Sequence, residues 1–187
     1  MTIQIGDKLP SATLFEFFHE ETAGCSLGPN AFEVQKEAAG KTIAILALPG
    51  AYTPTCSAKH VPGFIENSDA FKAKGVDEIW CISVNDAFVM YNWGKSLGVQ
   101  NVKMVPDGSG AFTRRMGMLI NKDHVGFGMR SWRYTAIVDD GVVVQMFVEP
   151  GINDVGTDSD PYVESTPEKA LEWVKANPYR GKLSQAA

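Results

Sequence analysis

Short apolar runs alternate with segments of helical character along the first two thirds of this chain of 187 residues. The apolar runs predict buried strands, whereas capping residues, glycines and prolines mark where the intervening helices begin and end. The pattern therefore predicts strands at residues 43–48, 78–84 and 102–105, and helices over 66–74, from 85 or 86 to 97, and from 107–110 through 115.

The last third of the chain leaves this alternation for a hairpin and a final helix. Residues 132–138 and 142–148 are predicted strands, joined by the sequence Asp-Asp-Gly, which is typical of a tight hairpin turn. Thr166 and Pro167 are a cap and a first helical residue, so a helix should begin there and end at Asn177.

Strand–helix alternation followed by a hairpin predicts a mixed central sheet with helices on both faces. The arrangement is an α/β fold, and the length fits a single domain over residues 1–187. The Gly-, Asp- and Pro-rich residues 149–161 are expected to form a loose surface loop between the last strand and the last helix.

Composition narrows the function classes. The net charge of −5 is mild and gives no reason to expect nucleic acid as a partner. No apolar stretch approaches the roughly 20 residues that span a bilayer, so no membrane partner is expected. Three cysteines are too few, and odd in number, for a secreted disulfide framework, and no signal-like segment is present. A cytoplasmic enzyme is the expectation.

The most informative polar feature follows the first predicted strand, at residues 49–56. Thr53 precedes Pro54, and these residue types favour a helix cap and a first helical position. Cys56 is therefore expected in the first helical turn, where unpartnered N–H groups and the helix dipole favour a thiolate. The helix should kink or end near Pro62.

Each residue of this stretch has an alternative interpretation. A cytosolic cysteine is most often a small buried hydrophobe, although Lys59 and His60, one turn after Cys56, favour a reactive thiolate. Thr53 could be a plain helix cap. His60 could be a general base, but a helical histidine is as often structural, and it stays outside the catalytic set. Cys56 and His60 supply two of the four ligands of a zinc site, so no metal and no cofactor are expected.

Three blocks of sequence resemble the peroxiredoxins, and specifically their type II branch. The run PGAYTPTCSAKHVPGF at residues 49–64 contains the pattern Pro-x-x-x-Thr-x-x-Cys, which is similar to the active-site signature of the family. CISVNDAFV at 81–89 and RYTAIVDDG at 133–141 resemble later segments of the same branch. Three blocks in order are more specific than one short motif. The resemblance implies a thioredoxin-like fold and thiol-dependent reduction of hydrogen peroxide and alkyl hydroperoxides.

The resemblance also implies roles for four residues. Cys56 would attack a peroxide oxygen as a thiolate and become a sulfenic acid. Thr53 and Arg133 would donate hydrogen bonds to the sulfur and the peroxide oxygens, where negative charge develops. Pro49 would shield the sulfur from bulk water.

Arg133 needs a closer argument, because an arginine on a strand is usually a surface residue with a packed stem. Alternation over residues 132–138 places Arg133 on one face of a strand with apolar residues on both faces. Such a strand is expected in the middle of the sheet, where a buried arginine needs a partner. Arg130, nearer a Gly-rich loop, is the alternative.

The residue that resolves the sulfenic acid is less well specified. Some type II enzymes use a late cysteine, and no cysteine follows residues 148–150 here. Cys81 matches the resolving position of plant type II enzymes, but its apolar strand is equally consistent with a buried core thiol. Cys25 lies in a Gly-flanked loop and no family motif marks it. We expect an external thiol, glutathione or a glutaredoxin, to reduce Cys56, with thioredoxin and a Cys56–Cys81 disulfide as the runner-up.

Assembly and rival functions complete the expectations. Tyr52, Phe88 and Trp93 would form a large apolar surface near the site, and related enzymes are dimers, so a homodimer is expected. A thioredoxin-type reductase would need Cys-x-x-Cys, which is absent. A cysteine hydrolase would need a cysteine–histidine pair with a third group that orients the histidine. A non-catalytic thiol redox sensor or chaperone-like oligomer is the alternative to the peroxidase.

Overall fold

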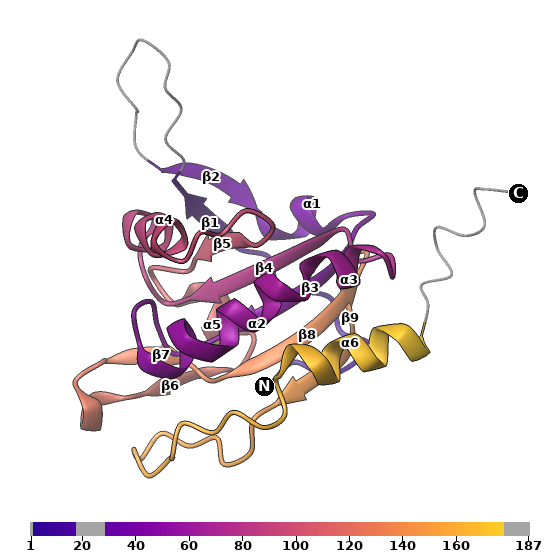
Figure 1. The fold of residues 1–187 in the computed structure, drawn as a ribbon. Helices are drawn as coiled ribbons and strands as arrows, with labels where there is room; N and C mark the ends of the chain where they lie inside the picture. The colour runs from indigo at the N-terminus through magenta and orange to yellow at the C-terminus, as the bar shows by residue number, and fades with distance from the viewer. Residues whose placement is uncertain (1, 18–28, 178–187) are drawn as a thin grey trace, which may run out of the picture.

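A mixed sheet of five strands, in the order β5-β4-β3-β8-β9, forms the centre of the molecule (Figure 1). The computed structural model describes residues 2–17 and 29–177. The parallel strands are β3 (Thr42–Ala47), β4 (Glu78–Ser83) and β5 (Lys103–Pro106), and the antiparallel strands are β8 (Tyr134–Asp139) and β9 (Val142–Val148). The predicted mixed sheet of a thioredoxin-like α/β fold is confirmed.

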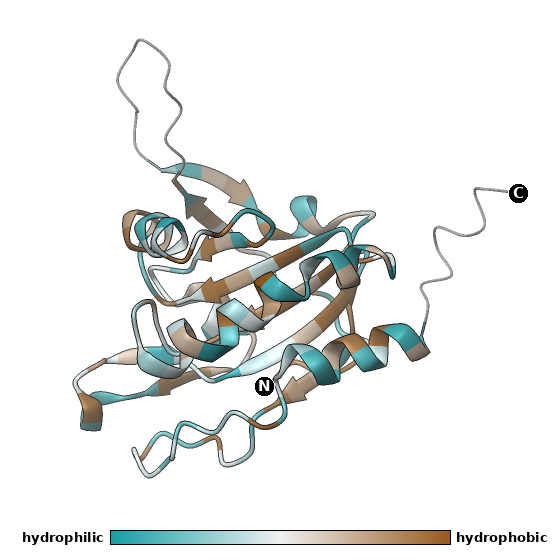
Figure 2. Ribbon diagram, in the orientation of Figure 1, coloured by the Kyte–Doolittle hydropathy of each residue, from teal (hydrophilic) through white to brown (hydrophobic). Residues whose placement is uncertain are grey.

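Helices cover both faces of this sheet, as predicted. One apolar cluster lies under α1 (Val34–Ala38), α5 (Ala111–Arg115) and the paired strands β1 (Thr13–Glu16) and β2 (Asn30–Glu33). The other lies under α2 (Val61–Glu66), α3 (Ser68–Lys72), α4 (Ala87–Ser96) and α6 (Pro167–Ala176). Figure 2 shows hydrophobic residues concentrated on the central strands between the two layers.

β8 confirms the predicted alternation of faces. Tyr134, Ala136 and Val138 belong to the first cluster, whereas Ile137 belongs to the second. β8 lies between β3 and β9, so the strand that follows Arg133 is central in the sheet, as expected. The cluster under α2 also contains Cys56. Arg133 therefore enters the sheet on the side that faces the cysteine.

Local signals explain several boundaries. The Asp86 carboxylate accepts from the N–H groups of Phe88 and Val89 and caps α4, and the Thr166 hydroxyl caps α6 in the same way. Asp140 and Gly141 have φ of 46° and 76°, and two consecutive positive φ angles are what a two-residue hairpin turn requires.

The predicted helix over residues 66–74 is wrong in its bounds. The helix that contains Cys56 continues as α2 to Glu66, and α3 begins at Ser68 after a turn at Asn67. Pro62 does not end the helix, although it has no N–H to donate within it; it is the second residue of α2, directly after the π-helical turn. The geometry does change near it, from a π-helix to an α-helix at Val61.

Short elements outside the expectations complete the fold. Besides α1, β1 and β2, they are β6 (Leu119–Asn121), the 3-10 helix η2 (Asp123–Val125) and β7 (Met129–Ser131), with β6 and β7 paired as a small antiparallel sheet. None of the helices in the described part of the chain is both long and apolar enough to cross a membrane.

Residues 149–166, here called the strap, join β9 to α6 without helix or strand. A loop was predicted over most of this range, but the strap is not loose. The carboxylate of Glu149, which is 1% exposed, accepts from the N–H groups of Val163, Glu164 and Ser165. Both ends of the strap are thereby tied together beside the sheet.

Candidate active site

Cys56 lies at the beginning of a helix that follows β3, as the sequence predicts. Helical geometry starts at Pro54, and Cys56 opens a π-helical turn, η1 (Cys56–His60), in which the N–H of Val61 donates to the Cys56 carbonyl. Single π-turns inside helices are rare and occur frequently at functional sites. Cys56 has an exposed fraction of 0%.

The turn between β3 and this helix is held in an unusual conformation. Tyr52 has φ of 61°, a left-handed conformation that is strained for a side chain of its size. The N–H of Ala51 donates to Asn85 Oδ1 at 3.0 Å, so the loop after β4 fixes the turn. Pro49, at the start of the turn, is buried.

Thr53 begins the helix through its backbone. Its carbonyl accepts from the N–H of Ser57 at 3.0 Å, whereas its hydroxyl donates to the Gly50 carbonyl at 2.8 Å. The predicted position of Thr53 before the helix is therefore confirmed, but its hydroxyl proton is used within the turn. The hydroxyl oxygen keeps lone pairs that can accept a hydrogen bond.

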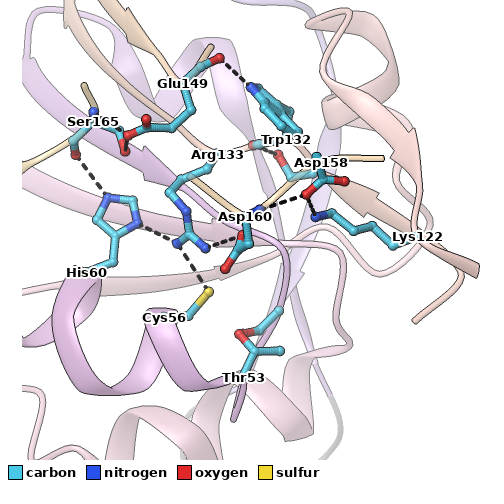
Figure 3. A network of polar contacts seen from close by, with 12 residues as sticks. Thr53, Cys56, His60, Lys122, Trp132, Arg133, Glu149, Asp158, Asp160 and Ser165 are labelled. Atoms are coloured by element: carbon cyan, nitrogen blue, oxygen red, sulfur yellow. Dashed lines mark hydrogen bonds and ion pairs between the residues drawn. The ribbon is translucent and has the colours of Figure 1, made fainter. Parts of the chain in front are cut away.

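Arg133 lies immediately before β8 and is 1% exposed. Its Nη1 is 3.4 Å from Cys56 Sγ, and its Nη2 donates to Asp160 Oδ1 at 2.6 Å (Figure 3). Burial lowers the pKa of Arg133, but the negative charges of Cys56 and Asp160 outweigh it, and the net shift is upward. The guanidinium is therefore a permanent cation beside the sulfur.

His60 contacts the arginine and not the sulfur. Its Nδ1 is 3.3 Å from Arg133 Nη1, and its Nε2 is 3.1 Å from the carbonyl oxygen of Ser165. Because a carbonyl can only accept, Nε2 carries the proton and Nδ1 accepts from Arg133. Burial, and then the charge of Arg133, lower the pKa of His60 to about 3. The histidine left outside the catalytic set is thus a neutral acceptor that faces Arg133.

Arg130, the alternative to Arg133, has different partners. Its Nε donates to the Phe127 carbonyl at 2.8 Å and its Nη1 to the Val84 carbonyl at 2.7 Å. Burial lowers its pKa. The structure therefore brings Arg133, and not Arg130, to Cys56.

Two carboxylates of the strap complete the surroundings of Arg133, and neither was identified from the sequence. Asp160 bonds Arg133 directly, and the Asp160 N–H donates to Asp158 Oδ1 at 3.0 Å. Asp158 forms a buried ion pair with Lys122; the Asp158 side chain is 2% exposed and the Lys122 side chain 4%. A buried arginine requires an anion, so the acidic strap could have been suspected, but its spacing does not indicate which aspartate reaches the site.

The other predicted residues are placed differently. Cys81 lies on β4, where it is 0% exposed, and burial, followed by the charge of Cys56, raises its pKa well above the usual value. Cys25 lies outside the described residues. Tyr52 and Phe88 are 57% and 49% exposed, whereas Trp93 is 0% exposed. The prediction that Trp93 adds to the exposed aromatic surface is therefore wrong, because its indole N–H is turned inward to Ser57 Oγ at 3.1 Å.

A cavity of about 350 Å³ lies against the same residues. Its wall includes Pro49 and Thr53 from the turn, Asp158 and Asp160 from the strap, and Lys122 from the chain after β6. The approach to the turn that carries Cys56 is thus bounded by the strap on one side.

Known proteins resemble this chain over most of its length. The family model described as Redoxin matches residues 4–163. A peroxiredoxin of Sinorhizobium fredii is 48% identical over 161 residues, 83% of this chain and 84% of its own. Peroxiredoxin-2B of Arabidopsis thaliana is 45% identical, over 80% of this chain and 89% of its own.

Among solved structures, reduced Prx3 of Vibrio vulnificus in complex with hydrogen peroxide is 38% identical, with a TM-score of 0.81 over 92% of this chain and 99% of that one. The family match and the relatives agree with the sequence blocks and the fold. The chain therefore belongs to the peroxiredoxins, in their type II branch, and is a thiol peroxidase with Cys56 as its peroxidatic cysteine.

Proposed function

We propose that this enzyme reduces hydrogen peroxide and alkyl hydroperoxides at a site in which Arg133 both stabilises the Cys56 thiolate and binds the peroxide. The carrying observation is the 3.4 Å contact between Arg133 Nη1 and Cys56 Sγ in a buried setting. A fixed cation is worth most where water is excluded, because the effective dielectric constant is low.

The chemical step follows from these positions. The thiolate of Cys56 attacks one peroxide oxygen, the S–O bond forms as the O–O bond breaks, and the second oxygen leaves with the electron pair. The leaving oxygen takes a proton and departs as water or an alcohol, and Cys56 is left as a sulfenic acid. Negative charge moves from sulfur to oxygen, and Arg133 can stabilise it at both positions.

Thr53 and Pro49 have supporting roles in this proposal. The Thr53 hydroxyl donates to Gly50, so its oxygen is available to accept the O–H of the incoming peroxide. Pro49 is buried beside the turn and has no N–H, and it would keep water from the sulfur without competing for hydrogen bonds.

An external thiol is proposed to reset Cys56. One thiol condenses with the sulfenic acid to give a mixed disulfide and water, and a second thiol releases Cys56 as a disulfide forms between the two. Burial of Cys81, which keeps its thiol protonated, supports glutathione or a glutaredoxin over an internal Cys56–Cys81 disulfide. Thioredoxin acting on that disulfide is the runner-up.

A cytoplasmic homodimer is the remaining part of the proposal. Tyr52 lies in the active-site turn and Phe88 at the start of α4, and both are about half exposed, at 57% and 49%. The Phe88 ring is 4.9 Å from that of Phe17, so aromatic surface is continuous there. Sedimentation as a monomer at micromolar concentration would contradict the dimer.

The function is tested by peroxide consumption with matched cysteine variants. The Cys56→Ser enzyme should lose all turnover, because a serine hydroxyl at its normal pKa is a poor nucleophile. The Cys81→Ser enzyme should keep the first oxidation step and full turnover with glutathione and glutaredoxin. Loss of turnover in Cys81→Ser, with a dominant Cys56–Cys81 disulfide by peptide mapping, would overturn the proposed reductant but not the peroxidase.

A further inference from the structure

The guanidinium of Arg133 is divided between two sets of acceptors. Nη1 faces Cys56 and His60, and Nη2 faces the carboxylate of Asp160 on the strap (Figure 3). Nε is buried without a hydrogen-bond partner in the described part of the chain. The contact to Asp160, at 2.6 Å, is the shortest of the three, and it is the one made to a carboxylate. Nη2 is therefore fixed from the strap.

The contacts of the strap hold the backbone of Asp160 in a left-handed conformation. Its φ of 49° is in the left-handed region, a strained conformation outside glycine that persists where the surroundings enforce it. Its N–H donates to Asp158 Oδ1, the same oxygen that accepts from the Lys122 ammonium group. The buried Lys122–Asp158 pair thus fixes the backbone of Asp160 from the residue that follows β6.

These contacts oppose a rotation of the Arg133 guanidinium that would turn its Nη1 away from Cys56 Sγ. A guanidinium held only at Nη1 can turn about its side-chain torsions and lose the alignment of that N–H with Cys56. Two acceptors on two different nitrogens define the plane of the group, as bidentate contacts do. Asp160 supplies the second acceptor from a chain segment 27 residues away from Arg133.

We propose that Asp160 is a positioning residue of the peroxidase reaction: its carboxylate oxygen, presented by the strap through Asp158 and Lys122, fixes Arg133 so that Nη1 points at Cys56. The proposal rests on the function proposed above for Arg133. Geometry, and not the negative charge of Asp160, is the contribution, because a carboxylate beside Arg133 partly offsets the attraction between Arg133 and a thiolate.

Two substitutions separate geometry from charge. Asp160→Asn keeps an oxygen that accepts from Nη2 and removes the charge, whereas Asp160→Ala removes both. Asp160 is 40% exposed, so neither change leaves a cavity in the core. Glu164→Gln is the matched control, since Glu164 is 45% exposed on the same strap and pairs with Lys169 instead.

The first measurement is the stopped-flow rate constant for oxidation of the reduced enzyme by hydrogen peroxide. Asp160→Ala should be slower by about tenfold or more, as expected for a misaligned transition-state donor. Asp160→Asn should stay within about threefold of wild type, and Glu164→Gln should equal it, since exposed ion pairs contribute little. Wild-type rates in Asp160→Ala, or equal losses in the Asn and Ala variants, would overturn the proposal.

The second measurement does not depend on turnover. In ¹⁵N spectra of the reduced enzyme, the two Nη groups of Arg133 should give separate signals, because both are held, and Arg133→Met identifies them by their loss. The signals should merge in Asp160→Ala and stay separate in Asp160→Asn. Separate signals in Asp160→Ala would overturn the positioning role. An undiminished rate in both Asp160→Ala and Arg133→Met, with merged signals in Asp160→Ala, would instead reject the function proposed for Arg133.

Discussion

Arg130 and Arg133 are three positions apart in the sequence, yet their side chains bind different kinds of partner. Arg130 lies on β7 and donates to two backbone carbonyls, those of Phe127 and Val84. Arg133 lies before β8 and donates to a thiol sulfur and a carboxylate. Arg133 is buried and Arg130 is partly buried, but only Arg133 contacts groups that carry negative charge.

The difference shows that partners, and not burial alone, determine what a buried cation does. Burial lowers the pKa of Arg130, and carbonyl dipoles do not reverse it. For Arg133 the anionic partners reverse the effect of burial. We therefore assign Arg130 to holding β7 against the loop after β4, and Arg133 to the chemistry at Cys56.

The largest expected effect is on the peroxide reaction itself. Arg133→Met should slow oxidation of Cys56 by roughly two to three orders of magnitude, because a lost transition-state donor costs about 3–4 kcal/mol. Arg130→Met should leave the rate within about threefold of wild type, as a residue without contact to the sulfur. Stopped-flow oxidation by hydrogen peroxide measures both. Equal losses in the two variants would erase the distinction between the arginines.

The second effect is on stability and belongs to Arg130. Arg130→Met leaves the carbonyls of Phe127 and Val84 without their donor, and a partly buried acceptor left unpaired costs about 1–2 kcal/mol. Urea unfolding should show this loss with an unchanged dependence on urea concentration. A variant as stable as wild type would show that water replaces the arginine and that Arg130 has no anchoring role.

A separate effect, on the pH dependence of stability, concerns His60. The pKa of His60 is about 3 when folded and near 6.5 when unfolded, so the unfolded chain binds a proton first. Stability therefore falls as pH drops from about 6.5 to about 3, by roughly 1.4 kcal/mol per pH unit in that window.

Arg133→Met removes the second cause of this shift but not burial, the first. The NMR pKa of His60 should therefore rise from about 3 while staying below 6.5, whereas Arg130→Met should leave it unchanged. A His60 pKa that does not move in Arg133→Met would mean that Arg133 does not influence the histidine.

Local chemistry made much of the fold predictable. The Asp-Asp-Gly turn, the Asp86 cap and the Thr166 cap each require a particular residue type at a particular backbone position. β1, β2, β6 and β7 were missed because each has only three or four residues, too few to show a period. Each of these strands forms only because it pairs with another short strand, and a single window of sequence does not show such pairing.

Site residues were predictable where a sequence motif marks them. Cys56 and Arg133 were predicted because a helix start and a family signature mark them, and the structure places Arg133 Nη1 3.4 Å from Cys56 Sγ. Thr53 was predicted from the same signature and lies directly before the helix, but its catalytic role stays a prediction. Asp160 and Ser165 were not found, because both act from a strap without periodicity, one through a left-handed backbone and the other through its carbonyl oxygen. A main-chain carbonyl is present in every residue, so sequence gives no signal for it.

The position of β3 between β4 and β8 has a consequence for the newly made protein. Cys56 and Arg133 are 77 residues apart in the chain, so translation at about 5–20 residues per second separates them by roughly 4–15 s. During that interval the emerging polypeptide carries the thiol without its cation. Contacts of such long range also form late in folding. The full peroxide reactivity of Cys56 should therefore appear only when β8 docks against β3.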